Sequence, residues 1–268
     1  MLLALAEHGV WPEMLVGTSA GAINATYVAG HPDPDDLQGL ATVWRDLTRS
    51  TVFPTRPLLG LRGFLGNADH LVPDTGIRNL VKSHLTFDRI EDANIPLHIV
   101  TTDATTGEEI VHSRGDTLDA VVASASIPGV LPPVSIDGRT QIDGGICNNT
   151  PISVAIQLGA TEIWVLPTGH ACSLGAHPRS ALAMILHSIT LLVQGRLVAD
   201  IHRYEPVTDL RVVPPLCPLN VSPTDFSQAD RLIADAYAST QQWLSAGVFD
   251  GTAAELLHPH SHAAAHSS

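Results

Sequence analysis

The stretch that decides the fold is Leu15-Val16-Gly17-Thr18-Ser19-Ala20-Gly21-Ala22-Ile23-Asn24-Ala25. It predicts a short apolar strand, a tight turn that carries a serine, and a helix, with the G-x-S-x-G spacing of a nucleophile elbow. Because so sharp a turn is strained, we expect the positions two residues before and after Ser19 to lack bulk, as Gly17 and Gly21 do. Ala20 keeps the near side of the serine open, and the N–H groups at the start of the helix favour a developing negative charge. We therefore predict that Ser19 is a nucleophile, although small residues also suit an ordinary strand-to-helix turn.

Length and composition favour one large α/β domain. The 268 residues are 44% hydrophobic and 15% charged, so the chain has ample material for a core. The 27 acidic residues exceed the 14 basic ones and give a formal charge of −13, which argues against nucleic acid as a partner. The same charge argues against electrostatic capture by anionic membranes, but it leaves open that an apolar rim enters lipid.

The cysteines and the N-terminus predict a cytoplasmic protein. Cys147, Cys172 and Cys217 form no C-x-x-C pair, so we expect free thiols in a reducing compartment and no metal site built from them. Residues 1–7 lack the basic start and the long apolar core of a signal peptide. No run of the sequence reaches the roughly 18 apolar residues that a membrane span needs.

The order of elements predicts the fold class. Strands alternate with helices, which indicates an α/β fold with a mostly parallel central sheet covered by helices on both faces. Ala22, Ala25 and Ala29 fall on one face of the elbow helix and let it lie close against that sheet. A hairpin over 130–142 has Asp137-Gly138, a strong turn signal, at its tip.

We expect residues 1–247 to form one domain. Within it, a wide apolar stripe over 182–197 predicts a core helix. Residues 248–268 read as a disordered tail rich in histidine, although histidine clusters also bind metal.

The stretch 51–76 is rich in glycine, proline and apolar residues and has no clear period. A long irregular stretch inside a compact domain is typical of a lid or a binding loop, so we predict an apolar lid over the active site. The alternative is an ordinary excursion that packs its own leucines. The apolar side chains that suit a fatty acyl chain here are Phe53, Leu58, Leu59, Leu61, Phe64 and Leu65.

Asp143 is the candidate base. A serine hydroxyl is a weak nucleophile until a neighbouring group takes its proton. Asp143 follows a predicted strand, and ligands of open α/β sheets bind at strand ends. Gly144 and Gly145 let the backbone pass close beside the serine, although Asp-Gly-Gly by itself also suits a plain turn.

The two motifs together resemble those of the patatin-like phospholipases. The matching residues are the elbow at 17–21, the aspartate motif at 143–145, the stretch 123–134 between them, and then Asn148 and Pro151, so that the resemblance runs from about residue 1 to about 245. It implies a patatin-like fold and a lipid acyl hydrolase with a Ser–Asp dyad and no catalytic histidine. Ser19 would attack the ester carbonyl to form an acyl-enzyme, and Asp143 would act as general base. The resemblance also implies lipid or acyl ester substrates, transient contact with a membrane or micelle surface, and no metal or organic cofactor.

The chain departs from the family before the elbow. Family members have a strand and a loop of the form G-G-G-x-[RK]-G there, whose N–H groups bind the oxyanion, and no such loop precedes Ser19. Loss of one oxyanion donor typically costs about 10²- to 10³-fold in rate. The Ala20 N–H is left as a donor. Either the chain starts late relative to a longer protein, or it is a catalytically impaired member that binds lipid or acyl groups.

A Ser-His-Asp esterase of the α/β-hydrolase type is the other alternative. In such an enzyme a histidine after Asp143, such as His187 or His202, would be the base. The chain order Ser, Asp, His is the one that these enzymes use. Against this interpretation, these enzymes place several strands before their elbow, whereas few residues precede Ser19 here.

Overall fold

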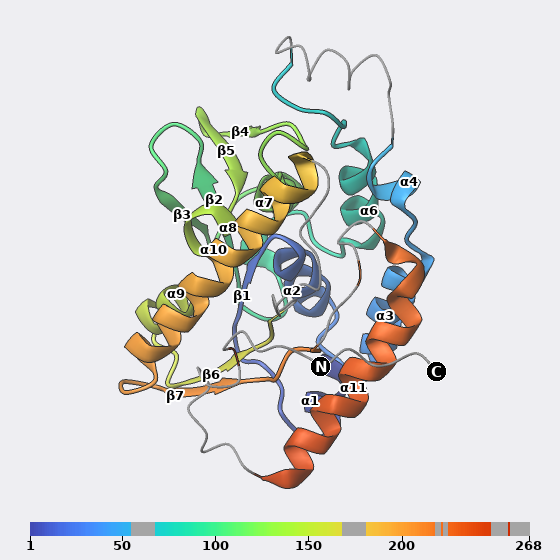
Figure 1. The fold of residues 1–268 in the computed structure, drawn as a ribbon, viewed down its shortest axis with the longest axis vertical. Coiled ribbons are helices and arrows are strands. Elements are labelled where there is room, and N and C mark those ends of the chain that lie inside the picture. Colours follow the sequence, from blue (N-terminus) through green and yellow to red (C-terminus); the bar gives the residue numbers. More distant parts are fainter. Residues whose placement is uncertain (55–67, 168–180, 218–220, 222–224, 248–256, 258–268) are drawn as a thin grey trace.

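The computed structural model describes residues 1–54, 68–167, 181–217, 221, 225–247 and 257, the backbone alone for 181–183 and 186, and it contains a mixed sheet flanked by helices (Figure 1). The main sheet consists of β1 (Leu15–Thr18), β2 (Leu97–Asp103), β3 (Glu109–His112), β4 (Val134–Ile136) and β5 (Arg139–Asp143). Its order is β1-β2-β5-β4, and β3 also pairs with β2. Two further strands, β6 (Glu162–Val165) and β7 (Asp209–Val212), pair with each other in parallel.

The expectation of a mostly parallel sheet is wrong. In the main sheet β1 runs parallel to β2, whereas β3 and β5 run antiparallel to β2, and β4 runs antiparallel to β5. For the pairs β2–β3 and β4–β5 the reason is the length of the connection, because a short turn joins only antiparallel neighbours. Gly107 (φ 74°) lies between β2 and β3, and Asp137 (φ 51°) and Gly138 (φ 77°) lie between β4 and β5. The predicted hairpin at Asp137-Gly138 is thereby confirmed.

Strand β2 carries both β1 and β5 along one of its edges. Thr18 of β1 is the partner of Val100, and Asp143 of β5 is the partner of the next residue, Thr101. Strand β3 pairs with both Val100 and Thr101 from the other edge, so β1 and β5 must share an edge. Because β1 reaches this point from one direction and β5 from the other, the last residues of the two strands meet.

Helices α2 (Ala20–Gly30), α6 (Thr75–His84) and α7 (Thr117–Ser124) pack on one face of the sheet. Ala22, Ala25 and Ala29 are buried there in one apolar cluster with Leu97 and Ile99 of β2. The small-residue face predicted for the elbow helix is therefore confirmed.

Helix α8 (Gly145–Asn148) lies against the opposite face of β2. Side chains alternate along a strand, so Thr102 points away from Ile99, and its Oγ1 lies 3.1 Å from Cys147 Sγ of α8. Helices α9 (Ile152–Gln157) and α10 (Ala181–Tyr204) continue this layer and enclose a second apolar cluster with β6 and β7. Within the described residues the sheet thus has helices on both faces, as expected.

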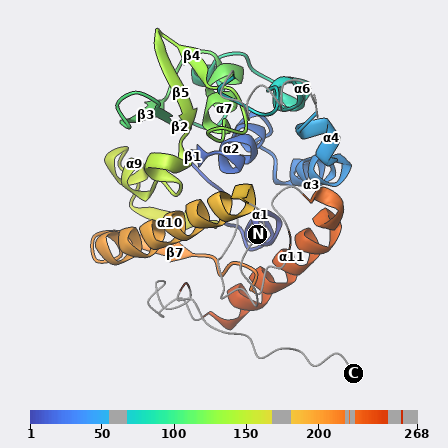
Figure 2. The same cartoon turned by 45° about the horizontal axis from the view of Figure 1, so that its top comes forward.

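The other α-helices of the described residues lie beside this sandwich. They are α1 (Leu2–Glu7), α3 (Leu37–Asp46), α4 (Arg49–Val52) and α11 (Ala229–Ala246). Helix α11 runs along α1 and α3, as Figures 1 and 2 both show. Its Tyr237 hydroxyl donates to Glu7 at 2.6 Å, and its Asp230 pairs with Arg45 at 2.6 Å.

The prediction of a core helix over 182–197 is wrong for the first half of α10. Ile185 is 57% exposed and Leu192 is 74% exposed, whereas Leu197 and Ile201 near the end of the helix are buried. An apolar stripe indicates that one face of a helix is hydrophobic, but it does not show whether another part of the chain packs against that face.

Two expectations about the ends and the cysteines also need correction. Cys217 is disulfide-bonded, so the expectation of free thiols is wrong for this residue, whereas Cys147 is free.

Leu257 is fully buried, and its carbonyl accepts a hydrogen bond from Gln194 at 3.0 Å, so this residue is not part of a disordered tail. The other residues of 248–268 lie outside the described part of the chain.

The predicted lid falls largely on residues that the structure does not describe. Leu58, Leu59, Leu61, Phe64 and Leu65 are among them. Phe53 is described and packs against the main apolar cluster, where its ring centroid lies 6.4 Å from that of Phe226. No helix in the described ranges combines the length and apolar character that crossing a membrane requires.

Gly144 provides a test of the contact between the end of β5 and strand β2. A Cβ on Gly144 would overlap the Val100 carbonyl oxygen, so Gly144→Ala is expected to lower the free energy of unfolding by about 1–3 kcal/mol. Gly195→Ala is the matched control, because a Cβ there meets nothing within 4 Å and alanine favours the helix by up to about 1 kcal/mol. Urea unfolding of the two variants measures both changes, and equal stabilities would contradict the close packing of Gly144.

Candidate active site

The sharp turn after β1 places Ser19 beside Asp143. The Ser19 hydroxyl donates a hydrogen bond to Asp143 Oδ2 at 2.7 Å, although 124 residues separate the two in the sequence. Ser19 has φ 54° and ψ −126°, a strained conformation for a residue with a side chain. The strained turn predicted from the G-x-S-x-G spacing is therefore confirmed. Ser19 is the N-cap of α2, but its hydroxyl makes no capping hydrogen bond and is directed to Asp143 instead.

The two elbow glycines have different surroundings. A Cβ on Gly17 would lie 2.7 Å from Ala22 Cα and 2.7 Å from the Gly21 carbonyl oxygen, so no larger residue fits there. A Cβ on Gly21 would meet nothing within 4 Å. The steric requirement predicted for Gly17 is confirmed and the one predicted for Gly21 is wrong, because Gly21 faces open space at the start of α2.

Asp143 is buried, with 6% of its surface exposed. Burial raises its pKa from the usual 3.8 to about 6, and the hydrogen bonds from the Ser19 hydroxyl and the Gly145 N–H lower it by a smaller amount. The Gly145 N–H donates to Asp143 Oδ1 at 2.7 Å, so each carboxyl oxygen has one donor. Above about pH 6 this carboxylate is positioned to take a proton from Ser19.

The glycines after Asp143 allow close contacts on both sides. A Cβ on Gly144 would lie 2.9 Å from Thr18 Cγ2, besides overlapping Val100. A Cβ on Gly145 would lie 2.9 Å from Asp143 Oδ1 and 2.8 Å from Asn149 Oδ1. At Gly144 the backbone therefore passes close to Thr18, the residue before Ser19, in agreement with the prediction that these glycines let the chain pass beside the serine.

Two buried serines, which the elbow and aspartate motifs do not include, hold this arrangement together. Ser124, at the end of α7, accepts a hydrogen bond from the Ser19 N–H at 2.9 Å and donates one to the Val100 carbonyl at 2.6 Å. The Ser126 carbonyl accepts from the Asp143 N–H at 2.9 Å. Both serine side chains are fully buried. The signal that would have found them is a Ser-x-Ser pair at the end of an apolar helix, where a hydroxyl without a partner is costly.

The start of α2 offers donors for a negative charge beside Ser19. The Ala20 and Gly21 N–H groups, in the first turn, make no hydrogen bond with any residue that the structure describes. Free N–H groups and the helix dipole together stabilise an anion at a helix N-terminus. An oxygen that becomes negative next to Ser19 Oγ therefore has two backbone donors nearby.

The histidines of the alternative hypothesis are not part of this arrangement. His187 and His202 both lie on α10, and His202 is exposed. Within the described ranges no histidine hydrogen-bonds to Ser19 or Asp143. The group in contact with the Ser19 hydroxyl that can accept its proton is the Asp143 carboxylate. The geometry thus favours a two-residue site over a Ser-His-Asp arrangement.

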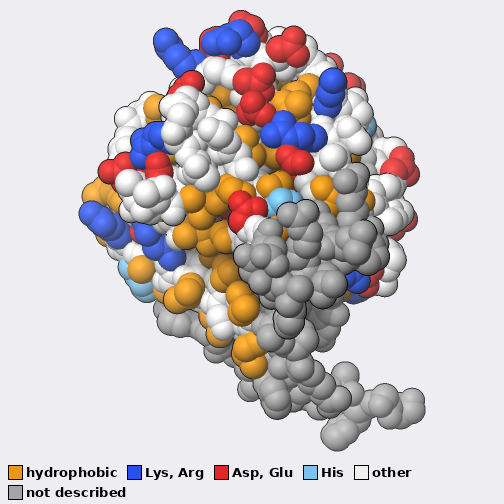
Figure 3. Space-filling view, turned by 90° about the horizontal axis from the view of Figure 1, so that it is seen from above, with side chains coloured by type: hydrophobic (Ala, Val, Ile, Leu, Met, Phe, Trp, Pro, Cys, Tyr) orange, Lys and Arg blue, Asp and Glu red, His pale blue; other side chains and the backbone are white. Residues whose placement is uncertain are grey.

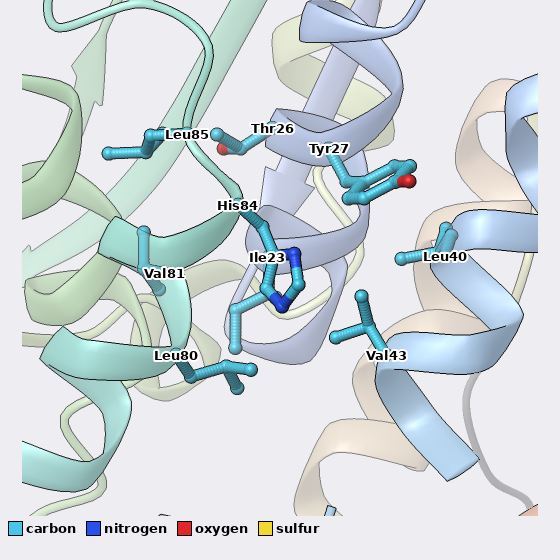
Figure 4. Close-up of a pocket in the computed structure, with 9 residues that line it drawn as sticks. All are labelled: Ile23, Thr26, Tyr27, Leu40, Val43, Leu80, Val81, His84 and Leu85. Carbon is cyan, nitrogen blue, oxygen red and sulfur yellow. The ribbon is translucent and has the colours of Figure 1, made fainter. Parts of the chain in front are cut away.

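Two adjoining cavities lie between α2, α3 and α6. The larger has a volume of about 740 Å³, and the smaller, of about 20 Å³, is almost entirely apolar (Figure 4). Tyr27 lines both cavities, and Ile23 lines the smaller one. Both residues lie on the same side of α2 as Ser19, Ile23 one turn beyond it and Tyr27 two turns beyond it. Phe53 lines neither cavity, so the structure does not place this predicted pocket residue there.

Comparisons with known proteins identify relatives over much of the chain. The sequence profile of the Patatin family, described as patatin-like phospholipase, matches residues 1–156. Patatin-like phospholipase domain-containing protein 7 of Rattus norvegicus is 30% identical over 178 residues, and the match covers 63% of this chain and 12% of that protein. An uncharacterized NTE family protein of Mycobacterium tuberculosis is 31% identical over 156 residues, which cover 56% of this chain and 24% of that protein. The chain therefore spans a small part of the length of these relatives.

A similar solved structure is the crystal structure of VipD from Legionella pneumophila. It matches with a TM-score of 0.47 and 15% sequence identity, and covers 91% of this chain and 63% of the VipD chain.

The raised pKa of Asp143 predicts how pH affects stability. The pKa of Asp143 is about 6 in the folded chain and near 3.8 in the unfolded chain. The folded state therefore binds this proton more tightly, which stabilises it fully below about pH 4. This stabilisation is lost as the pH rises through 6. Asp143→Asn cannot ionise and is expected to be more stable than the native chain at pH 8, by on the order of 3 kcal/mol. Urea unfolding at several values between pH 4 and pH 8 measures this difference, which should vanish at the acid end.

Ser135→Ala, an exposed residue that carries no titratable group, is the control and should show a small, nearly constant difference from the native chain. An Asp143→Asn variant that is less stable than the native chain at pH 8 would contradict the raised pKa.

Proposed function

Because the chain belongs to the patatin-like phospholipase family, we propose that it is a serine hydrolase that cleaves carboxylic esters of lipids through an acyl-enzyme on Ser19. The observation that carries the proposal is the 2.7 Å hydrogen bond between Ser19 Oγ and Asp143 Oδ2. A strained serine, a carboxylate with a raised pKa and free N–H groups meet at this one point. These are the nucleophile, the base and the oxyanion donors that acyl transfer requires.

The reaction proceeds in two halves. As Ser19 Oγ attacks the ester carbonyl carbon, its proton moves to Asp143, and the carbonyl oxygen becomes negative beside the Ala20 and Gly21 N–H groups. Collapse of this intermediate breaks the ester bond, and the leaving alcohol takes the proton from Asp143. A water molecule then attacks the acyl-enzyme while Asp143 accepts one of its protons, and the acid leaves as Ser19 Oγ regains that proton.

The acyl chain of the substrate lies along α2 in this proposal. Ser19 and Ile23 share one side of the helix, and the apolar cavity lined by Ile23, Leu40, Val43 and Leu80 begins one turn from the nucleophile. The larger cavity continues from it past Tyr27 and has polar side chains at its rim. Burial of the methylene groups of a fatty acyl chain against these apolar side chains would be favourable.

Substitution of the two central residues tests the reaction. Ser19→Ala is expected to lower turnover of p-nitrophenyl butyrate and of a phosphatidylcholine by at least about a thousandfold, and Asp143→Asn by a similar factor, because the two groups act as a unit. Native kcat/KM should fall about tenfold per pH unit below pH 6, where Asp143 becomes protonated. Steady-state rates between pH 4.5 and pH 9 measure all three effects.

The exposed Ser135→Ala is the matched control and should retain native rates. Turnover that survives in Ser19→Ala would show that the nucleophile is another residue. A native chain that binds fatty acid but hydrolyses neither ester would favour the acyl-binding alternative.

Narrowing the apolar cavity tests the placement of the acyl chain. Leu80→Trp fills the space between α6 and α2 and is expected to reduce kcat/KM for a p-nitrophenyl palmitate by about tenfold or more, with less than a twofold effect on the acetate. Lys82→Trp, on the exposed side of α6, is the control and should leave the ratio of the two substrates unchanged. Equal losses for both substrates in Leu80→Trp would place the acyl chain elsewhere.

A further inference from the structure

The first half of α10 exposes large apolar side chains to solvent. Met184 and Leu191 are 40% and 48% exposed, besides Ile185 and Leu192 described above. Exposed apolar surface of this kind usually marks a contact site, because isolated apolar side chains are common on proteins but groups of them are not. Residues 181–195 also contain no aspartate, glutamate, lysine or arginine, in a chain whose formal charge is −13.

This surface is attached to the segment that carries Asp143. The Arg196 guanidinium donates to the Cys147 carbonyl at 3.1 Å and so joins α10 to α8. Helix α8 begins two residues after Asp143, and its Ile146 is 48% exposed. We call the α8–α10 surface the group Ile146, Met184, Ile185, Leu191 and Leu192. Figure 3 shows a band of hydrophobic side chains on the face of the molecule that is seen from above, with charged side chains at its borders.

We propose that the α8–α10 surface docks onto the surface of a neutral or zwitterionic lipid bilayer or micelle, and so holds Ser19 and Asp143 at the interface. The inference rests on the proposed function, because a lipid ester substrate is presented by such an aggregate. The charge pattern selects the lipid: an uncharged apolar surface on an acidic chain complements phosphatidylcholine, whereas anionic lipid would repel the chain.

The length of the apolar segment fits a helix that lies on lipid rather than one that crosses it. Fifteen helical residues extend about 22 Å, which is shorter than the roughly 30 Å hydrocarbon core. Docking of this kind needs no positive charge, so it should depend little on salt. Burial of the five side chains in the interfacial layer removes apolar area from water, and this is the force that drives it.

Vesicle partition of the full chain tests the proposal. In a Ser19→Ala background, which prevents hydrolysis, the chain is mixed with phosphatidylcholine vesicles, and the bound fraction is measured by flotation at low and high salt. Ile185→Glu combined with Leu192→Glu should reduce the partition coefficient by about tenfold or more, because both exposed side chains then carry charge. The matched control is Val207→Glu, since Val207 is 71% exposed beyond the other end of α10 and should leave partition unchanged.

Activity of the same substitutions with Ser19 restored separates this inference from the proposed function. The double variant should hydrolyse p-nitrophenyl butyrate at the native rate, which also shows that it folds, but should lose most hydrolysis of vesicle phosphatidylcholine. The proposal would be overturned if the double variant bound vesicles as well as the native chain does. It would also be overturned if the native chain were a dimer that the double substitution dissociates while vesicle binding stays the same. Absence of turnover on every ester, with partition that responds to the double substitution, would instead reject the proposed function and retain the docking surface.

Discussion

The register of three strands is the constraint on which the rest of the structure depends. Strand β2 pairs with the last residue of β1 at Val100 and with the last residue of β5 at Thr101, so two segments of chain end at adjacent points on one edge. Ser19 directly follows the first of these ends, and Asp143 is the second. A shift of one residue in either pairing would turn the side chains to the other face of the sheet and separate the two groups. The hydrogen bond between Ser19 and Asp143 is thus a consequence of how β2 pairs.

The candidate site is held by groups that take no part in the proposed reaction. Ser124 bonds to the backbone of both Ser19 and Val100, and Ser126 bonds to the backbone of Asp143, so the end of α7 fixes the elbow and the aspartate together. This support offsets two unfavourable features, the left-handed backbone of Ser19 and the buried carboxyl of Asp143. Strain and a buried ionisable group commonly persist where surrounding structure enforces them and function requires them.

Local signals in the sequence predict the local parts of this structure well. The elbow, the turn at Asp137-Gly138 and the small-residue face of α2 each depend on a few neighbouring residues, and each is confirmed. The predicted direction of the strands is wrong because it depends on which strands pair, and alternation of strands and helices does not determine that. The exposure of Leu192 could not be predicted, because the periodicity of a helix does not say whether another element covers it. The role of Ser124 is a long-range contact that no local pattern shows.

The long separation between the two halves of the site has a consequence for the order of folding. Ser19 and Asp143 are 124 residues apart, and β1 and β2 are separated by helices α2, α3, α4 and α6. Pairings between distant segments close large loops, so they form late and slowly compared with helices and hairpins. A partly folded or nascent chain therefore holds Ser19 without the Asp143 carboxylate beside it, and the proposed reaction becomes possible only when the sheet is complete. In the proposed function, the topology thus keeps Ser19 unreactive until the structure around it has formed.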